Sequence, residues 1–170
     1  RVLENGSSSY IEKVIQRWKV DVRLSTRINR VIRESDRVCI QTAFGEQYFD
    51  QVVFACHSDQ ALALLHTPSE AEASILGAIR YQNNETILHH DAKVLPPNPK
   101  AWAAWNVNIR NNDATQCTVS YCMNILQGIE SPEPFVVSLN QRGQIDANKI
   151  IAVMDYQHPI YTHEMVNAQK

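Results

Sequence analysis

Glycine is scarce in this chain of 170 residues, which contains only five. None of the five forms G-x-G-x-x-G or a P-loop. In these two glycine-rich turns, backbone amides approach and hold the phosphates of a nucleotide. The sequence therefore contains no recognisable phosphate-binding motif.

An excess of charge and long apolar runs are also lacking. The net charge is -2, which gives no electrostatic argument for binding nucleic acid or an anionic membrane. The apolar runs are far shorter than the roughly 20 residues that span a bilayer, so we expect no integral membrane segment. No signal-peptide pattern is present at the N-terminus, and we expect a cytoplasmic protein.

Cysteine is present but scattered, at Cys39, Cys56, Cys117 and Cys122. Cys117 and Cys122 lie in a strand-like run at an odd separation, so their side chains should point to opposite faces. This spacing argues against a shared metal ion and against a local disulfide. We expect four free thiols, as in most cytosolic proteins.

The N-terminal part of the chain predicts one helix and then short strands. Apolar side chains recur at helical spacing over residues 10–18, and Ser9 with Glu12 fits a capping box. A period of two then predicts strands at residues 20–24, 28–32, 38–42 and 47–50. The run at residues 52–56 carries no charge and predicts a strand that is buried on both faces. A helix capped by Ser58 should follow.

Further along, a second helix and a sheet are expected. Thr67-Pro68-Ser69-Glu70 predicts a helix that is capped by Thr67 and runs to about residue 78. Strands are predicted at residues 86–90, 102–109, 116–126, 135–139 and 150–154, separated by turn signals such as Asn111-Asn112-Asp113. The pattern favours an α+β fold with a mostly antiparallel or mixed sheet and a few helices. A change of composition near Ile79 is the candidate boundary between two subdomains.

The order of these signals resembles the flavin-containing amine oxidase superfamily, and most closely its bacterial NAD/FAD-binding oxidoreductase branch. The stretches that carry the resemblance are "VRLSTRINRV", "FDQVVFACHSDQALALL", "ILGAIRYQNNETILHHDAKVLP" and "HPIYTHEM". The resemblance implies that residues 1–56 are the β-rich portion of an FAD-binding domain. Residues 57–170 would then be a helical pair and an antiparallel-sheet substrate domain, as in FAD-linked reductases.

The resemblance also implies cofactor-binding residues. The position that matches Val31 touches the adenine end of FAD through its backbone, and the positions that match Ala55 and Cys56 lie close to the cofactor. Small or apolar residues suit such places, because backbone groups and packing hold the cofactor there. Plain core packing is the alternative for all three residues.

Two substrate-facing residues follow from the same resemblance. Amine oxidases usually carry a lysine near the start of the strand after the helical pair, and the matching position here is Thr86, or Glu85 if the alignment shifts. This departure puts amine oxidation in doubt but leaves oxidation or desaturation of an apolar substrate open. Trp102 and Trp105 are predicted on opposite faces of one strand. Trp105 is the substrate-facing candidate, with core packing as the alternative.

The family's two glycine-rich flavin segments would lie before Arg1 and beyond Lys170, so we expect a piece of a longer enzyme. By this interpretation the complete protein is an FAD-dependent oxidoreductase with a small-molecule substrate. The piece itself should be inactive, bind FAD weakly or not at all, and self-associate through apolar surface that the absent segments would cover. A binding module without a cofactor is the rival interpretation.

The remaining candidate groups are interpreted as structural. His89 and His90 are adjacent on a predicted strand and should point to opposite faces, so with Asp91 they are not expected to share a metal ion. His158 and His163 are expected at the surface or in loops. Cys56 and His57 are neighbours at a strand end, where side chains rarely converge as a thiolate–imidazole pair requires.

Overall fold

The computed structural model describes residues 2–3, 6–109 and 117–170. The chain divides into two compact units. Unit 1 comprises Arg1–Val20 and Asn83–Gln157, and unit 2 comprises Asp21–Gln82 and His158–Lys170. The boundary expected near Ile79 thus lies close to the break after Gln82. The assignment of residues 1–56 to a flavin domain and of residues 57–170 to a substrate domain stays a prediction.

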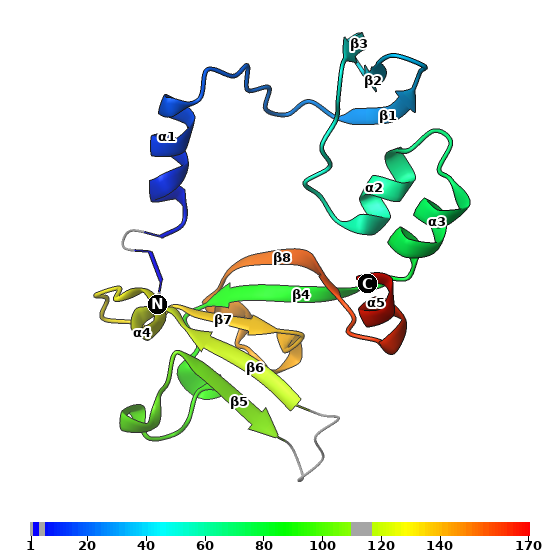
Figure 1. Ribbon diagram of the computed structural model, residues 1–170. Coiled ribbons are helices and arrows are strands. Elements are labelled where there is room, and N and C mark those ends of the chain that lie inside the picture. The colour runs from blue at the N-terminus through cyan, green and yellow to red at the C-terminus, as the bar shows by residue number, and fades with distance from the viewer. Residues whose placement is uncertain (1, 4–5, 110–116) are drawn as a thin grey trace. The chain divides into compact units, whose positions relative to one another are not determined.

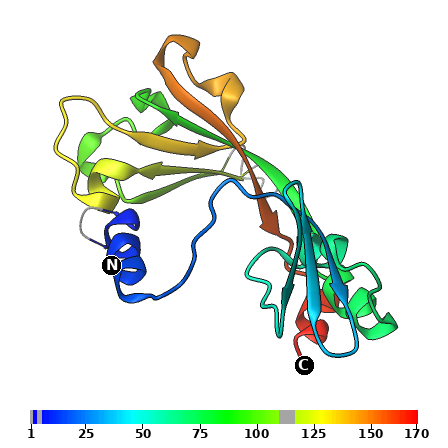
Figure 2. The ribbon, with the colours of Figure 1, turned by 90° about the horizontal axis from the view of Figure 1, so that it is seen from above.

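Unit 2 contains a three-stranded antiparallel sheet in the order β1-β2-β3 (Figure 2). Its strands are β1 (Ile28–Arg33), β2 (Val38–Thr42) and β3 (Gly45–Phe49), which confirms the strands predicted at residues 28–32, 38–42 and 47–50. Gly45 has a φ of 114°, a conformation that favours glycine, and it pairs with Thr42 across the tight turn. The short connections therefore fix the register of this sheet.

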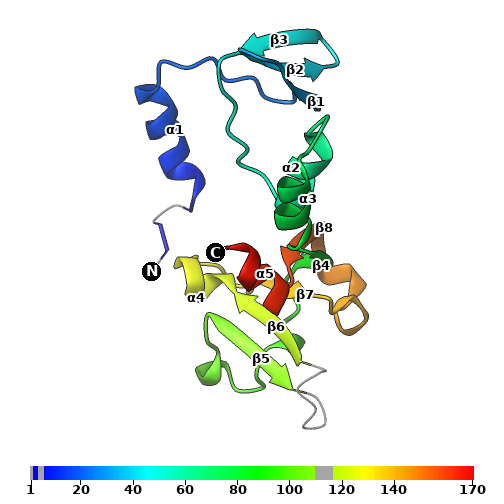
Figure 3. The same ribbon diagram turned by 45° about the vertical axis from the view of Figure 1, so that its right-hand side comes forward.

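A helical pair follows the sheet, with α2 (Ser58–Leu64) and α3 (Glu70–Gly77) side by side (Figure 3). The predicted caps are wrong by one and two residues, because His57 caps α2 and Ser69 caps α3. Ser69 Oγ accepts the Glu72 N–H at 3.2 Å, and Glu72 Oε2 accepts the Ser69 N–H at 2.8 Å. A third helix, α5 (His163–Ala168), begins after Thr162.

Two predicted strands are absent from the described sheets. Residues 20–24 and 52–56 form no ladder, and Val53, expected in a buried strand, is 90% exposed. Alternating or apolar residues make a strand only beside a partner, and the described residues supply none for these two segments. The helix predicted at residues 10–18 is present as α1 (Ser8–Arg17), but without the expected capping box. Ser9 Oγ instead donates to the Gly6 carbonyl at 2.7 Å.

Unit 1 is built on a five-stranded sheet in the order β5-β6-β7-β4-β8 (Figure 1). Its strands are β4 (Tyr81–His89), β5 (Trp105–Ile109), β6 (Cys117–Cys122), β7 (Val136–Leu139) and β8 (Ile150–Pro159). The β5–β6, β6–β7 and β7–β4 pairs are antiparallel. The sheet and the helices confirm the α+β class.

The predicted strand over residues 116–126 stops at Cys122. It gives way to α4 (Met123–Gln127), which ends at Gly128 with a φ of 67°. The predicted strand over residues 102–109 begins only at Trp105. Residue 116 and the turn expected at residues 111–113 lie outside the described residues. Short 3-10 turns connect the strands: η1 (Ala92–Val94), η2 (Pro99–Ala101), η5 (Arg142–Gln144) and η6 (Ala147–Lys149).

The hydrophobic core of unit 1 lies on one side of its sheet. Leu95, Cys122 and Val136 are buried together, and Trp102 packs against them. Trp102 Nε1 donates to the Pro96 carbonyl at 2.8 Å, so this tryptophan is a core residue rather than the outward partner of Trp105 on one strand. No helix among the described residues is long and apolar enough to cross a membrane.

Three of the cysteines are seen as free thiols. Cys39 and Cys122 are buried, and Cys56 is exposed. The prediction for the Cys117 side chain lies outside what the structure describes. Burial of Cys39 and Cys122 makes them packing residues, since a reactive thiol needs access to its partner.

Candidate functional site

The two predicted substrate residues lie on the same face of the five-stranded sheet. Leu88 pairs with Val137, Val137 with Tyr121, and Tyr121 with Trp105. Thr86 lies two residues before Leu88, and alternation along a strand puts both on one face. Three strand spacings separate β4 from β5 in the sheet order, a distance of about 14 Å.

Over β4, β5, β6 and β7, the described residues of this face, which we call the apolar face, include no charged side chain. Its members are Thr86, Leu88, Trp105, Val107, Ile109, Val119, Tyr121, Val137 and Leu139. Trp105 is 64% exposed, and its ring meets the edge of Tyr121 with centroids 5.3 Å apart and planes at 76°. Such an edge-to-face pair is the preferred geometry for two aromatic rings. The Tyr121 and Thr86 hydroxyls are the polar groups of the face.

Thr86 is much less accessible than Trp105. It is only 4% exposed, and its Oγ1 donates to the Asn84 carbonyl at 3.4 Å, near the limit for a hydrogen bond. A substrate on the apolar face would therefore meet the Trp105 end first. Contact with Thr86 requires movement of the groups that cover it.

The opposite face of the same sheet holds a buried hydrogen-bond chain. His89 Nδ1 accepts the Asp91 N–H at 3.0 Å, which fixes the neutral tautomer with its proton on Nε2. His89 Nε2 then donates to Ser138 Oγ at 2.9 Å. Ser138 Oγ shares a 2.8 Å hydrogen bond with Ser120 Oγ, which also accepts from Gln141 Nε2 at 3.1 Å. Both ring nitrogens of His89 are thus in use.

Burial and hydrogen bonding shift two acid–base groups next to this chain. Burial lowers the pKa of His89 from 6.5, the nearby Asp91 charge opposes the change, and His90 adds to it. Burial alone would raise the pKa of Asp91. The N–H groups of Asp146 and Lys93 donate to the Asp91 carboxylate at 2.9 and 3.1 Å. Together with the positive charge of Lys149 they outweigh the effect of burial, and the pKa of Asp91 lies below 3.8. His89 is therefore held neutral and Asp91 ionised.

His90 is separated from His89 as expected for neighbours on a strand. Its Nδ1 lies 3.0 Å from the Pro134 carbonyl, and its ring lies 4.7 Å from that of Phe135. His89 and His90 are thus directed to different partners. Each ring contacts a different part of the chain, Ser138 for His89 and Pro134 for His90.

The predicted cofactor residues lie in unit 2. Val31 is buried in β1 at 3% exposure, and its carbonyl accepts the His66 N–H at 2.9 Å. A nucleotide contact at Val31 would have to compete with this pairing to the Leu65 segment or use a second lone pair on that oxygen. Ala55 and Cys56 are exposed, and their segment joins no sheet. The backbone groups of residues 55–56 are therefore accessible to a cofactor, whereas those of Val31 are partly used in hydrogen bonds within the protein.

An apolar pocket of about 490 Å³ lies between the small sheet and the helical pair. Val31, Val52, Phe54, Ala61 and Ile75 are among the side chains that line it. One predicted cofactor residue, Val31, and the segment that leads to Ala55 and Cys56 therefore meet around one cavity. The lining could flank a planar apolar group, but it contains no glycine-rich turn for a pyrophosphate.

An ion pair lies at the rim of this pocket. Arg33 Nη1 and Nη2 contact the two Glu72 carboxylate oxygens at 2.7 and 2.8 Å, and Nη2 also donates to the Thr67 carbonyl at 2.8 Å. The Arg33 hydrogen bonds, followed by the Ser69 N–H, lower the pKa of Glu72 to about 2. Arg33 Nη1 and Nη2 are thus both engaged within the protein.

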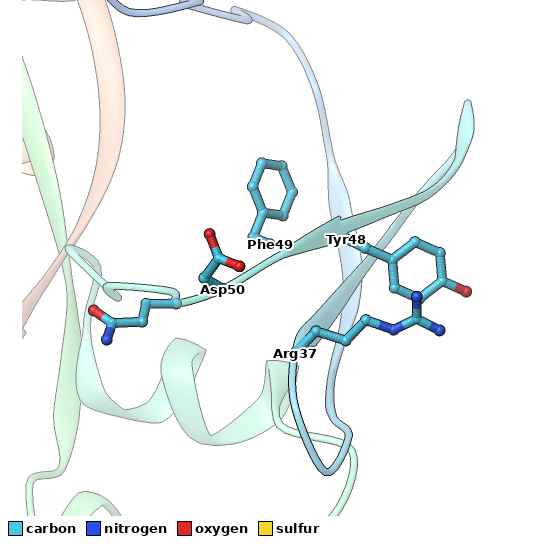
Figure 4. Close-up of a pocket in the computed structure, with 5 residues that line it drawn as sticks. Arg37, Tyr48, Phe49 and Asp50 are labelled. Carbon is cyan, nitrogen blue, oxygen red and sulfur yellow. The ribbon is translucent and has the colours of Figure 1, made fainter.

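A second, more open hollow of about 610 Å³ lies at the end of β3 (Figure 4). The Arg37 guanidinium lies 4.0 Å from the Tyr48 ring centre, and Arg37 Nε contacts Glu34 at 2.6 Å. Tyr48 Oη donates to Glu46 at 3.0 Å. Because Arg37 and Tyr48 are already engaged with Glu34 and Glu46, this hollow is a weaker candidate than the apolar face.

Sequence reasoning missed Tyr121 and the hydrogen-bond chain. Tyr121 lies in a run that predicts only a strand, and its contact with Trp105 depends on the β5–β6 register. The chain joins His89, Ser120 and Ser138, which are far apart in sequence. A serine on each of two buried strands was the available signal, but serine alone does not indicate a partner.

Comparison with known proteins gives structural likenesses only. No protein-family model matches the chain, and no curated protein matches it. One similar solved structure is named "Putative protoporphyrinogen oxidase from Exiguobacterium sp. 255-15", with 17% identity and a TM-score of 0.61 over 94% of this chain and 41% of that one. Another is a CLA-producing fatty acid isomerase from P. acnes, with 13% identity and a TM-score of 0.58 over 92% of this chain and 39% of that one.

These likenesses concern the fold and only part of each neighbour. The chain spans about two-fifths of the length of both proteins. At such identities a common fold is shown, while activity and ligands are not. The chain shares its fold with segments of an oxidase-like protein and a fatty acid isomerase.

Proposed function

We propose that this chain is part of an FAD-dependent oxidoreductase whose substrate lies on the apolar face of the five-stranded sheet. The sequence resemblance to flavin-containing amine oxidases and the fold likeness to the two solved structures support this proposal. The observation that carries it is the common face of Thr86 and Trp105, the two residues that the resemblance implies as substrate-facing.

The chemistry of the face favours an apolar organic substrate. It offers aliphatic side chains and an exposed aromatic pair, Trp105 and Tyr121, without a charge to desolvate. Ligand sites commonly combine such a lining with a few polar groups that orient the ligand. The Tyr121 hydroxyl would orient the substrate, and Thr86 would contact it after local movement. One of the solved neighbours is named for a fatty acid, a substrate of this apolar class.

The flavin itself would need groups that this sequence does not contain. The segment at residues 55–56 and the Val31 cavity would flank the cofactor, and a phosphate cradle would come from elsewhere in a longer protein. Bound flavin would supply the electron-accepting chemistry. The role of the present residues is to bind and orient the substrate and to exclude water from it.

The proposal is tested by the absorption spectrum of the longest natural polypeptide that contains this chain. We expect a yellow protein that releases FAD on denaturation. A Trp105→Ala variant should keep the yellow colour and bind apolar substrates more weakly, whereas Trp102→Phe serves as the core-tryptophan control. A colourless polypeptide would favour the cofactor-free binding module instead.

A further inference from the structure

β5 is the outer strand of the five-stranded sheet, and within the described part of the chain it pairs with β6 alone (Figure 1). The Ala104 carbonyl accepts the Cys122 N–H at 3.1 Å, which sets the phase of this antiparallel pair. Hydrogen-bonded and non-bonded positions alternate along such a pair. The backbone N–H and C=O groups of Trp105, Val107 and Ile109 therefore point away from β6.

These outward groups form an accessible edge. Among the described residues, no other segment donates to or accepts from the backbone of Trp105 or Val107. A hollow of about 350 Å³ lies beside the strand, lined in part by Pro96, Asn106 and Val107.

The strand's own residues lack the features that normally protect an edge. Trp105–Ile109 contains no charge and no proline, and its side chains are typical of β-structure. Trp105, Val107 and Ile109 are 64%, 58% and 54% exposed. A row of free backbone groups beside three exposed apolar side chains is a template for pairing with another strand.

We propose that this edge pairs antiparallel with β5 of a second copy of the chain, about a two-fold axis at Val107. In this register Val107 faces Val107 of the second copy, and Trp105 faces Ile109. Each of these facing pairs is of the hydrogen-bonded type, because all the residues involved have outward backbone groups. The apolar faces of the two sheets become continuous, and no like charges oppose one another.

The pairing closes after two copies. The same strand serves both partners, so the interface is isologous and leaves no second β5 edge free. The interface is small, and a concentration-dependent dimer is expected rather than a permanent one. This proposal is independent of flavin binding and of the proposed substrate.

The test uses the whole 170-residue chain and charge variants at the predicted axis. Wild type should change from one to two copies as its concentration rises in sedimentation equilibrium. Val107→Lys and Val107→Glu should each remain a single copy, because like charges would face each other across the axis. A mixture of the two variants should recover the dimer, because Lys then faces Glu.

Val53→Lys is the matched control, since Val53 is 90% exposed but lies outside every sheet. It should dimerise as wild type does, and circular dichroism should show the same secondary structure in all variants. A wild type that stays monomeric, a dimer that survives both Val107 variants, or a mixture that stays monomeric would overturn the proposal. Assembly beyond two copies would also contradict it.

Discussion

The buried imidazole of His89 should make the stability of the protein fall as the pH is lowered. Its Nδ1 accepts the Asp91 N–H at 3.0 Å, so a second proton on the ring would remove this acceptor. Burial already lowers the pKa of His89 from 6.5 in the folded protein. The unfolded chain therefore binds the proton first, and His89 contributes stability above pH 6.5 that is lost as the pH falls below it.

The size of the effect follows from proton linkage. Between the ordinary pKa of 6.5 and the lower folded pKa, unfolding takes up one proton at His89. The free energy of unfolding should then fall by about 1.4 kcal/mol for each pH unit from this residue alone. Urea unfolding at several pH values, followed by tryptophan fluorescence, measures the slope.

Two neighbouring variants separate this slope from other histidines. His89→Gln should be less stable at neutral pH by about 1–3 kcal/mol, because buried partners lose hydrogen bonds, and it should lose the slope below pH 6.5. His90→Gln should keep the slope, because His89 and its partners remain. If His89→Gln and wild type show the same pH dependence, the tautomer and burial arguments are wrong.

Three further predictions concern other groups. Arg33→Gln should raise the pKa of Glu72 from about 2 toward 4.5 in a carboxyl NMR titration; an unchanged value would mean that Arg33 does not hold Glu72. Asp91→Asn should lower stability at pH 7 by about 1–3 kcal/mol in urea unfolding, since two N–H groups need its two oxygens. In this variant the free energy of unfolding should fall less steeply below pH 3.8 than in wild type, because the Asp91 carboxylate is no longer there to be protonated. An unchanged fall would refute the lowered pKa of Asp91. Calorimetric titration of the chain with FAD should show weak or no binding, and low-micromolar affinity would contradict this expectation.

Local patterns predicted the elements whose signals and partners are close in the sequence. The strands of unit 2 were found because β1, β2 and β3 are joined by short turns and pair with their neighbours. The same alternation at residues 20–24 predicted a strand that is not there. Alternation with a period of two indicates which side chains could share a face of a strand. A strand forms only where a partner strand provides hydrogen bonds for its backbone N–H and C=O groups.

The start of α3 shows how a distant contact selects between two local signals. Thr67 with Glu70 and Ser69 with Glu72 both have the spacing of a capping box. Arg33, which lies on β1, binds the Glu72 carboxylate and the Thr67 carbonyl, and Ser69 becomes the cap. The sequence contains both signals but not the position of Arg33.

The candidate site was predicted residue by residue but not as an arrangement. Thr86 and Trp105 were each proposed from the family resemblance, and only the register across four strands places them on one face. The burial of Thr86 could not be foreseen, since it depends on what lies over β4. Val31, Ala55 and Cys56 remain predictions whose test requires the cofactor.

The buried polar chain gives a physical reason for that register. Ser120, Ser138 and His89 lie on three neighbouring strands and hydrogen bond in sequence across them. A slip of one residue in any strand would move its side chains to the other face and leave these buried polar groups without partners. Since faces alternate along a strand, the register that satisfies His89 and the two serines also directs Leu88, Val137 and Tyr121 to the apolar face, and the β5–β6 pairing then places Trp105 beside Tyr121. The buried hydrogen bonds on one side of the sheet thereby determine which side chains the apolar face can offer to a substrate.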